Sequence, residues 1–141
     1  MKSLLIICAV MISLNLATAQ EVFGIWKTID DNTGKAKAYI EIYEEDGMAY
    51  GKILELINPK QENPKCDRCP DEDKGKPVVG LKFIKGLHKD GSIYSGGKIL
   101  DPANGKLYKC YITLEGDDTL KVRGYIGITL LGRTQYWYRK K

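Results

Sequence analysis

The sequence predicts an all-β fold, an eight-stranded antiparallel up-and-down barrel. Apolar residues recur at a period of two from residue 22 onward, which is typical of half-buried strands. Clusters of Gly, Asp, Asn and Pro separate these runs, and most connections between consecutive runs are short. The predicted strands are 22–29, 35–44, 48–57, 78–84, 92–100, 106–114, 119–128 and 133–140.

The first three predicted strands are the clearest. The first ends at a polar turn over residues 30–34. In the second, Ala38, Ile40 and Ile42 occupy alternate positions and therefore share one face. Asp46-Gly47 is a strong hairpin signal, so the third strand should pair directly with the second.

A long polar stretch follows, over residues 58–76, and we expect it to be a loop. Its prolines and its lack of apolar periodicity argue against both a helix and a strand. The later strands are separated by turn signals at Asp90-Gly91, residues 101–105 and residues 115–118. We therefore expect the second half of the chain to consist of consecutive hairpins.

A closed barrel and a two-sheet sandwich both protect the edges of eight strands. Tight turns between consecutive runs favour the barrel, because a Greek-key sandwich needs several long crossings. Glycines within the predicted strands favour it too, since they suit sharp bends at barrel corners. These glycines are Gly51, Gly80, Gly96, Gly97, Gly124 and Gly127.

Residues 1–19 are expected to be a cleaved signal peptide. Lys2 precedes a short apolar segment that ends in Ala17-Thr18-Ala19, and this segment is too short to span a bilayer as a helix. Residues 20–141 then form one domain, exported to the periplasm or secreted. The formal charge of +4 is spread along the chain without a basic run, which argues against nucleic acid as a partner.

The long loop contains two cysteines, Cys66 and Cys69. An oxidising compartment favours a disulfide, and one of the three cysteines beyond the signal segment must stay unpaired. Cys110 shares a strand face with Tyr108 and Ile112, which suits a small buried apolar residue. We therefore predict the pair Cys66–Cys69, and the state of Cys110 stays open.

The sequence offers little basis for catalysis, so we expect no enzyme. His88 is the only histidine, and its neighbours Gly86 and Gly91 suggest that it lies in a turn. Zinc would need four ligands at workable spacing, and the chain offers only the CxxC pair, the isolated Cys110 and the single His88. No metal or other cofactor is therefore expected.

Two residues near the chain ends suggest how the barrel closes. Trp26 lies in the first predicted strand and Arg139 in the last. These strands are neighbours in a closed barrel, so the guanidinium can stack over the indole and seal one end. A Gly-x-Trp opening with a terminal Arg is similar to the calycin superfamily, which includes lipocalins.

Longer motifs carry a more specific resemblance. The matching segments run over residues 66–69, 76–81, 95–102, 104–108, 120–127 and 131–135, with Trp137 and the Gly24-x-Trp26 opening. The chain resembles the uncharacterised bacterial family called domain of unknown function 2147. The resemblance implies export and a calycin-like barrel, and it implies no activity.

A barrel of eight strands either fills with side chains or holds one small ligand. The first hypothesis is binding of a small apolar or amphipathic molecule, oriented by Lys98, Arg123, Tyr125 and Arg133. The alternative is a protein-interaction or envelope-maintenance module with a filled interior, acting through the long loop. Whether the interior is hollow or filled separates the two.

Overall fold

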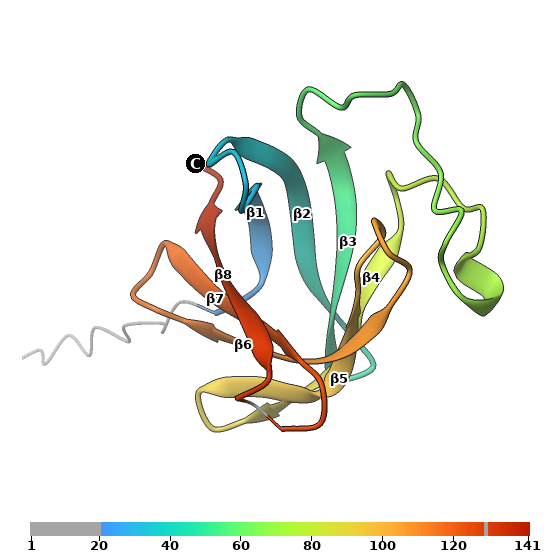
Figure 1. The fold of residues 1–141 in the computed structure, drawn as a ribbon. Helices are drawn as coiled ribbons and strands as arrows, with labels where there is room; N and C mark the ends of the chain where they lie inside the picture. The colour runs from blue at the N-terminus through green and yellow to red at the C-terminus, as the bar shows by residue number, and fades with distance from the viewer. Residues whose placement is uncertain (1–20, 129) are drawn as a thin grey trace, which may run out of the picture.

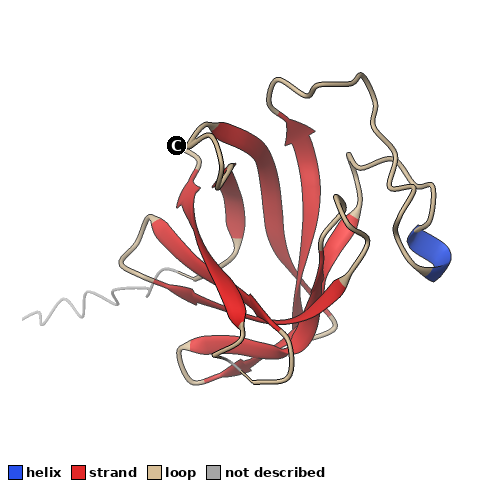
Figure 2. Cartoon of the chain, in the orientation of Figure 1, coloured by secondary structure: helices blue, strands red, loops and turns tan. Residues whose placement is uncertain are grey.

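A computed structural model describes residues 21–128 and 130–141, and these residues form eight antiparallel strands in one closed barrel (Figures 1 and 2). The predicted fold is confirmed. The proposed signal segment, residues 1–19, lies outside the described residues. The strands are β1 (Gly24–Ile29), β2 (Ala36–Glu45), β3 (Met48–Leu56), β4 (Lys82–Asp90), β5 (Ile93–Leu100), β6 (Leu107–Leu114), β7 (Thr119–Tyr125) and β8 (Gly132–Arg139).

Each strand pairs with its neighbour in the sequence, and β1 pairs with β8 to close the barrel (Figure 1). At this seam Trp26 lies opposite Arg139 in the register. The Arg139 guanidinium carbon stands 4.3 Å from the centroid of the Trp26 ring. The guanidinium also donates hydrogen bonds to three backbone oxygens, those of Asp117, Phe23 and Glu21, at 3.0, 2.9 and 2.8 Å. One side chain thus ties β8 and residues 21–23 to the β6–β7 turn.

The fourth strand differs from its prediction. It begins four residues later, at Lys82, and continues to Asp90, so His88 lies within β4 opposite Ser95 and not in a turn. Residues 78–81 precede the strand: the Val78 amide donates to the Pro64 oxygen at 2.9 Å, the Gly80 amide donates to the Ile53 oxygen of β3 at 2.7 Å, and Gly80 has φ of +91°. Gly80 and Gly127 therefore lie in loops, while the other four glycines lie in strands.

Gly97 shows why a barrel of this kind needs a glycine within a strand. A Cβ at this position would lie 2.2 Å from the backbone oxygen of Lys85 on the neighbouring strand β4. No side chain fits there unless the two strands separate. The close approach bends β5 where its register with β6 shifts, between Tyr94 and Gly97.

The long connection between β3 and β4, residues 57–81, forms a strap on the outside of the barrel (Figure 1). The predicted disulfide Cys66–Cys69 is confirmed, and both cysteines are buried. A single 3-10 turn, Asp71–Asp73, follows it (Figure 2). The described part of the chain contains no helix that is long and apolar enough to cross a bilayer.

Asp73 fixes the strap to the wall of the barrel. Its buried carboxylate accepts hydrogen bonds from Lys85 of β4 and, at 3.4 Å, from Lys76. Burial alone would raise the pKa of Asp73, but hydrogen bonds and positive charge from Lys85 and Lys76 lower it below its usual value. The carboxylate therefore stays ionised and keeps both lysines as partners at neutral pH.

Candidate ligand-binding site

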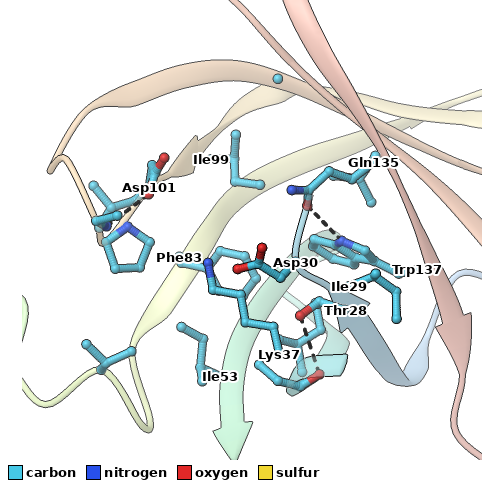
Figure 3. A pocket seen from close by; sticks show the side chains of 18 of the residues that line it. Thr28, Ile29, Asp30, Lys37, Ile53, Phe83, Ile99, Asp101, Gln135 and Trp137 are labelled. Carbon is cyan, nitrogen blue, oxygen red and sulfur yellow. Dashed lines mark hydrogen bonds between the residues drawn. The ribbon is translucent and has the colours of Figure 1, made fainter. Parts of the chain in front are cut away.

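The barrel contains an open cavity of about 1330 Å³ (Figure 3). The inner part of its wall is apolar and comes from six different strands. A volume of this size is above the roughly 300–1,000 Å³ that small-molecule pockets usually have. The buried apolar lining side chains include Ile40, Phe83, Leu100, Val122 and Trp137.

The cavity takes up only part of the barrel. A second set of buried side chains fills the remainder and does not line the cavity. We call this part the filled end, and the part that contains the cavity the open end. The side chains of the filled end include Trp26, Ile42, Leu87, Ile112 and Leu120.

A gradient of side-chain size along single strands makes one end hollow. On β7, alternate residues change from Leu120 at the filled end to Val122 and then Gly124 at the cavity wall. Because alternate residues of a strand face the same side of the sheet, each step removes volume from the interior. On β2 the corresponding residues are Ile42, Ile40 and Ala38.

A polar chain runs along the cavity wall from its buried part to its mouth. The Trp137 indole N–H donates to Gln135 Oε1 at 3.0 Å, which Figure 3 shows as a dashed line. Gln135 Nε2 donates in turn to Asp31 Oδ2 at 2.8 Å. The same oxygen lies 3.3 Å from Arg133 Nε. This chain holds the Trp137 ring in place and provides polar atoms beside an apolar wall.

The mouth of the cavity carries more positive than negative charge. Two carboxylates line it, Asp30 and Asp101, and backbone N–H groups already donate to both. The N–H groups of Thr33 and Asn32 lower the pKa of Asp30, which therefore stays ionised beside Lys37. Five cationic side chains line the cavity: Lys35, Lys37, Lys60, Lys65 and Arg133.

The structure places only two of the four predicted orienting residues at the cavity. Arg133 and Tyr125 line it, whereas Lys98 and Arg123 do not. Lys98 follows the inward-facing Gly97 and lies exposed opposite Lys85 and Lys109. Arg123 lies between the cavity-lining Val122 and Gly124, so it faces outward, where Nη1 donates to Thr134 Oγ1 at 2.8 Å. Both side chains therefore lie outside the interior.

Sequence reasoning missed the side chains that shape the site most: Phe83, Gln135, Trp137 and Lys37. The alternation of β8 was the available signal, because Arg133, Gln135 and Trp137 occupy alternate positions of that strand. Phe83 lies inside the predicted strand 78–84, but the adjacent Ile84 is also apolar and buried, so alternation does not tell which of the two faces the cavity. Lys37 lies beside the cavity because the mouth begins where β2 begins.

The residues considered for chemistry lie away from the cavity. His88 is exposed on β4, and Cys110 is a buried free thiol outside the cavity lining. Burial raises the pKa of Cys110 to about 12, so the thiol stays protonated. Within residues 21–128 and 130–141, no cluster of three or more His, Cys, Asp or Glu side chains is arranged to hold a metal ion.

Comparison with known proteins supports the fold and the family resemblance. The family model described as "Uncharacterized protein conserved in bacteria (DUF2147)" matches residues 24–139, which confirms the resemblance seen in the sequence motifs. The solved structure of protein HP1028 from Helicobacter pylori, described as belonging to the lipocalin family, is similar with a TM-score of 0.76. The two chains are 21% identical, and the match covers 87% of this chain and 85% of the other. No curated protein shows significant sequence similarity.

Proposed function

Because the chain belongs to the bacterial family DUF2147 and has a lipocalin-like barrel, we propose that it binds one small apolar or amphipathic molecule in the cavity. The observation that carries this proposal is the hollow open end, with its apolar wall of Ile40, Phe83 and Trp137. Burying such a wall against the apolar part of a ligand is favourable, because it removes both surfaces from water.

The distribution of polar groups favours an amphipathic ligand over a purely apolar one. The buried part of the cavity offers aliphatic and aromatic carbon, whereas its mouth carries Lys37 and Arg133 with the Gln135 amide between them and Trp137. A molecule with an apolar tail and an acidic or polar head matches both parts. The tail would contact Phe83 and Trp137, and the head would stay near the cations and water.

This function needs no reaction, in keeping with a lipocalin-like fold, which typically binds ligands. An exported location is part of the proposal. It is supported by the signal-like segment at residues 1–19 and by the disulfide Cys66–Cys69, which persists in oxidising compartments.

The alternative was an interaction module with a filled interior and a recognition loop. The cavity argues against a filled interior, and the strap is itself tied to the barrel by Asp73. A Cβ on Gly105 would lie 1.7 Å from the backbone oxygen of Arg68, so the strap also packs tightly on the β5–β6 turn. These contacts support a structural role for the strap.

Fluorescence titration with cis-parinaric acid tests the proposal. This fluorescent acid has an apolar chain and absorbs where tryptophan emits, so binding near Trp137 should quench Trp137 and excite the probe. The variant Trp26→Phe leaves Trp137 as the only tryptophan. We expect saturable binding of one molecule per chain, and the absence of any saturable transfer would contradict the proposal.

A blocking variant separates cavity binding from surface adsorption. Ala38→Phe places a large side chain in the cavity and should weaken binding of the probe about tenfold or more. Glu41→Phe is the matched control, because Glu41 lies on the same strand with its side chain partly exposed on the outer face. Equal affinities in the two variants would place the probe outside the barrel.

A further inference from the structure

The β7–β8 connection carries four large apolar side chains in water. Ile126, Ile128, Leu130 and Leu131 are 62%, 59%, 83% and 65% exposed, which makes them the most exposed large apolar residues in the described part of the chain. We call these four residues the apolar tip. None of them belongs to the buried core, so packing of the barrel does not explain their apolar character.

Backbone hydrogen bonds join three of the four residues of the apolar tip. The Ile126 amide donates to the Leu131 oxygen at 2.9 Å, and the Leu131 amide donates to the Ile128 oxygen at 3.1 Å. The first of these bonds extends the β7–β8 pairing beyond the last strand pair, Tyr125 with Gly132, and the four side chains are exposed. Exposed apolar groups gathered in this way mark a surface that contacts a partner or a membrane.

The tip lies at the mouth of the cavity. Ile126 and Leu131 line the cavity itself, whereas Ile128 and Leu130 extend beyond its wall. Lys109 of the neighbouring strand β6 brings a further cation there, with its Nζ 3.5 Å from the Gly127 oxygen. Aliphatic side chains and positive charge therefore surround the same opening.

The chemistry of this rim fits an anionic lipid bilayer. Five cations and two carboxylates line the cavity, and Lys109 adds another positive charge beside the tip. Anionic headgroups attract such cations, while isoleucine and leucine side chains enter the boundary between headgroups and acyl chains. Protein interaction sites rely more on Trp, Tyr and Arg, and residues 126–131 contain none of these.

We propose that the open end docks on an anionic bilayer by inserting the apolar tip. Docking would place the cavity mouth against the lipid surface, so that an amphipathic ligand passes between membrane and barrel with its apolar part out of bulk water. The docking step stands independently of the ligand. The transfer step rests on the proposed binding function.

Vesicle sedimentation tests docking with two lipid compositions: mixed phosphatidylglycerol and phosphatidylcholine, and phosphatidylcholine alone. We expect the protein to bind the anionic vesicles, and added salt should weaken this binding because it screens the cations. The variant Ile128→Ser/Leu130→Ser should bind at least about tenfold more weakly, since two inserted side chains are lost. Ile93→Ser is the control, because Ile93 is exposed but does not line the cavity.

A second variant tests the charge. Lys109→Gln should weaken binding to anionic vesicles about fivefold and leave binding to phosphatidylcholine unchanged. No binding of the protein to anionic vesicles, or equal binding by Ile128→Ser/Leu130→Ser, would overturn the proposal. So would a dimer that this double variant dissociates, because the tip would then be a contact between two copies of the chain.

Binding of cis-parinaric acid in solution distinguishes a failure of the docking proposal from a failure of the proposed binding function. Ile128 and Leu130 do not line the cavity, so Ile128→Ser/Leu130→Ser should bind the probe like the unmodified protein while losing the vesicles. Tip-dependent vesicle binding without probe binding would support docking and contradict the binding function. Loss of probe binding in the double variant would overturn the assignment of these two residues to docking alone.

Discussion

The two ends of the barrel are built from the same eight strands and differ in what fills them. At the filled end, Trp26 has no exposed surface, its indole N–H donates to the Val22 oxygen at 2.9 Å, and Arg139 covers the ring. At the open end, Trp137 is nearly as buried but lines a cavity, and its indole N–H donates to a side chain that leads to the mouth.

This difference indicates that one set of residues closes the β-barrel and another set forms the binding cavity. The pairing of β1 with β8 depends on Arg139, whose guanidinium donates to the backbone oxygens of Phe23 and Glu21. The cavity depends on side-chain size, which decreases along β7 from Leu120 to Gly124. Substitutions at the filled end should therefore affect stability, and substitutions at the open end should affect ligand binding.

The largest expected effect on stability is the difference between variants of the two tryptophans. Trp26→Ala leaves a void in a closely packed region and should lower the free energy of unfolding by about 3–5 kcal/mol. Trp137→Ala enlarges a cavity that is already open to water, so its cost should be smaller, while affinity for cis-parinaric acid falls. Urea unfolding measures the stability of both variants. An equal loss of stability in the two would contradict the division into two ends.

The next effect concerns the two arginines of β8. Arg139→Gln removes the contact with Trp26 and the guanidinium hydrogen bonds to backbone oxygens, and should cost about 2–3 kcal/mol. Arg133→Gln removes one exposed ion pair with Asp31 and should cost no more than about 0.5 kcal/mol. Thermal unfolding of both variants would show whether the seam depends on Arg139; equal melting temperatures would show that it does not.

The disulfide should have a smaller effect, confined to the strap. Cys66→Ala/Cys69→Ala removes a cross-link that closes a four-residue loop, worth about 2 kcal/mol on the chain-entropy estimate. The unmodified protein under reducing conditions should match this variant in urea unfolding. Because the cysteines do not line the cavity, its ligand affinity should stay unchanged; a loss of affinity would show that the strap shapes the site.

Cys110 should have the smallest effect on stability at neutral pH. Burial raises the pKa of its thiol from 9.0 to about 12, so iodoacetamide should label Cys110 only after unfolding. The unfolded thiol loses its proton first as pH rises, and Cys110 should therefore destabilise the fold progressively between about pH 9 and 12. Cys110→Ala should reduce this alkaline loss, and rapid labelling of the folded protein at neutral pH would contradict the burial.

Much of the fold could be predicted because its signals are local. Alternation identified eight strands, and Gly24-x-Trp26 with Arg139 indicated the seam. β4 was predicted to begin too early because residues 78–81 are mostly apolar, yet they bond to Pro64 of the strap and to Ile53 of β3 outside the regular strand, a tertiary effect that periodicity does not report. The cavity residues were partly missed because the sequence does not show how far each strand extends beyond the filled end. Alternation along β7 places Arg123 outside, between Val122 and Gly124. Lys98, in contrast, shares parity with the buried Tyr94 and Leu100, and it faces outward because of the register shift between Tyr94 and Gly97, which alternation does not predict.

One spectrum tests the central claim most directly, because the chain has two tryptophans and one lies at each end of the barrel. In a ¹H–¹⁵N spectrum their indole N–H groups give two signals, which Trp137→Phe assigns. On titration with cis-parinaric acid, the Trp137 signal should shift until one equivalent is bound, while the Trp26 signal stays in place. A shift of the Trp26 signal alone, or equal shifts of both, would contradict the separation of a filled end from a binding end.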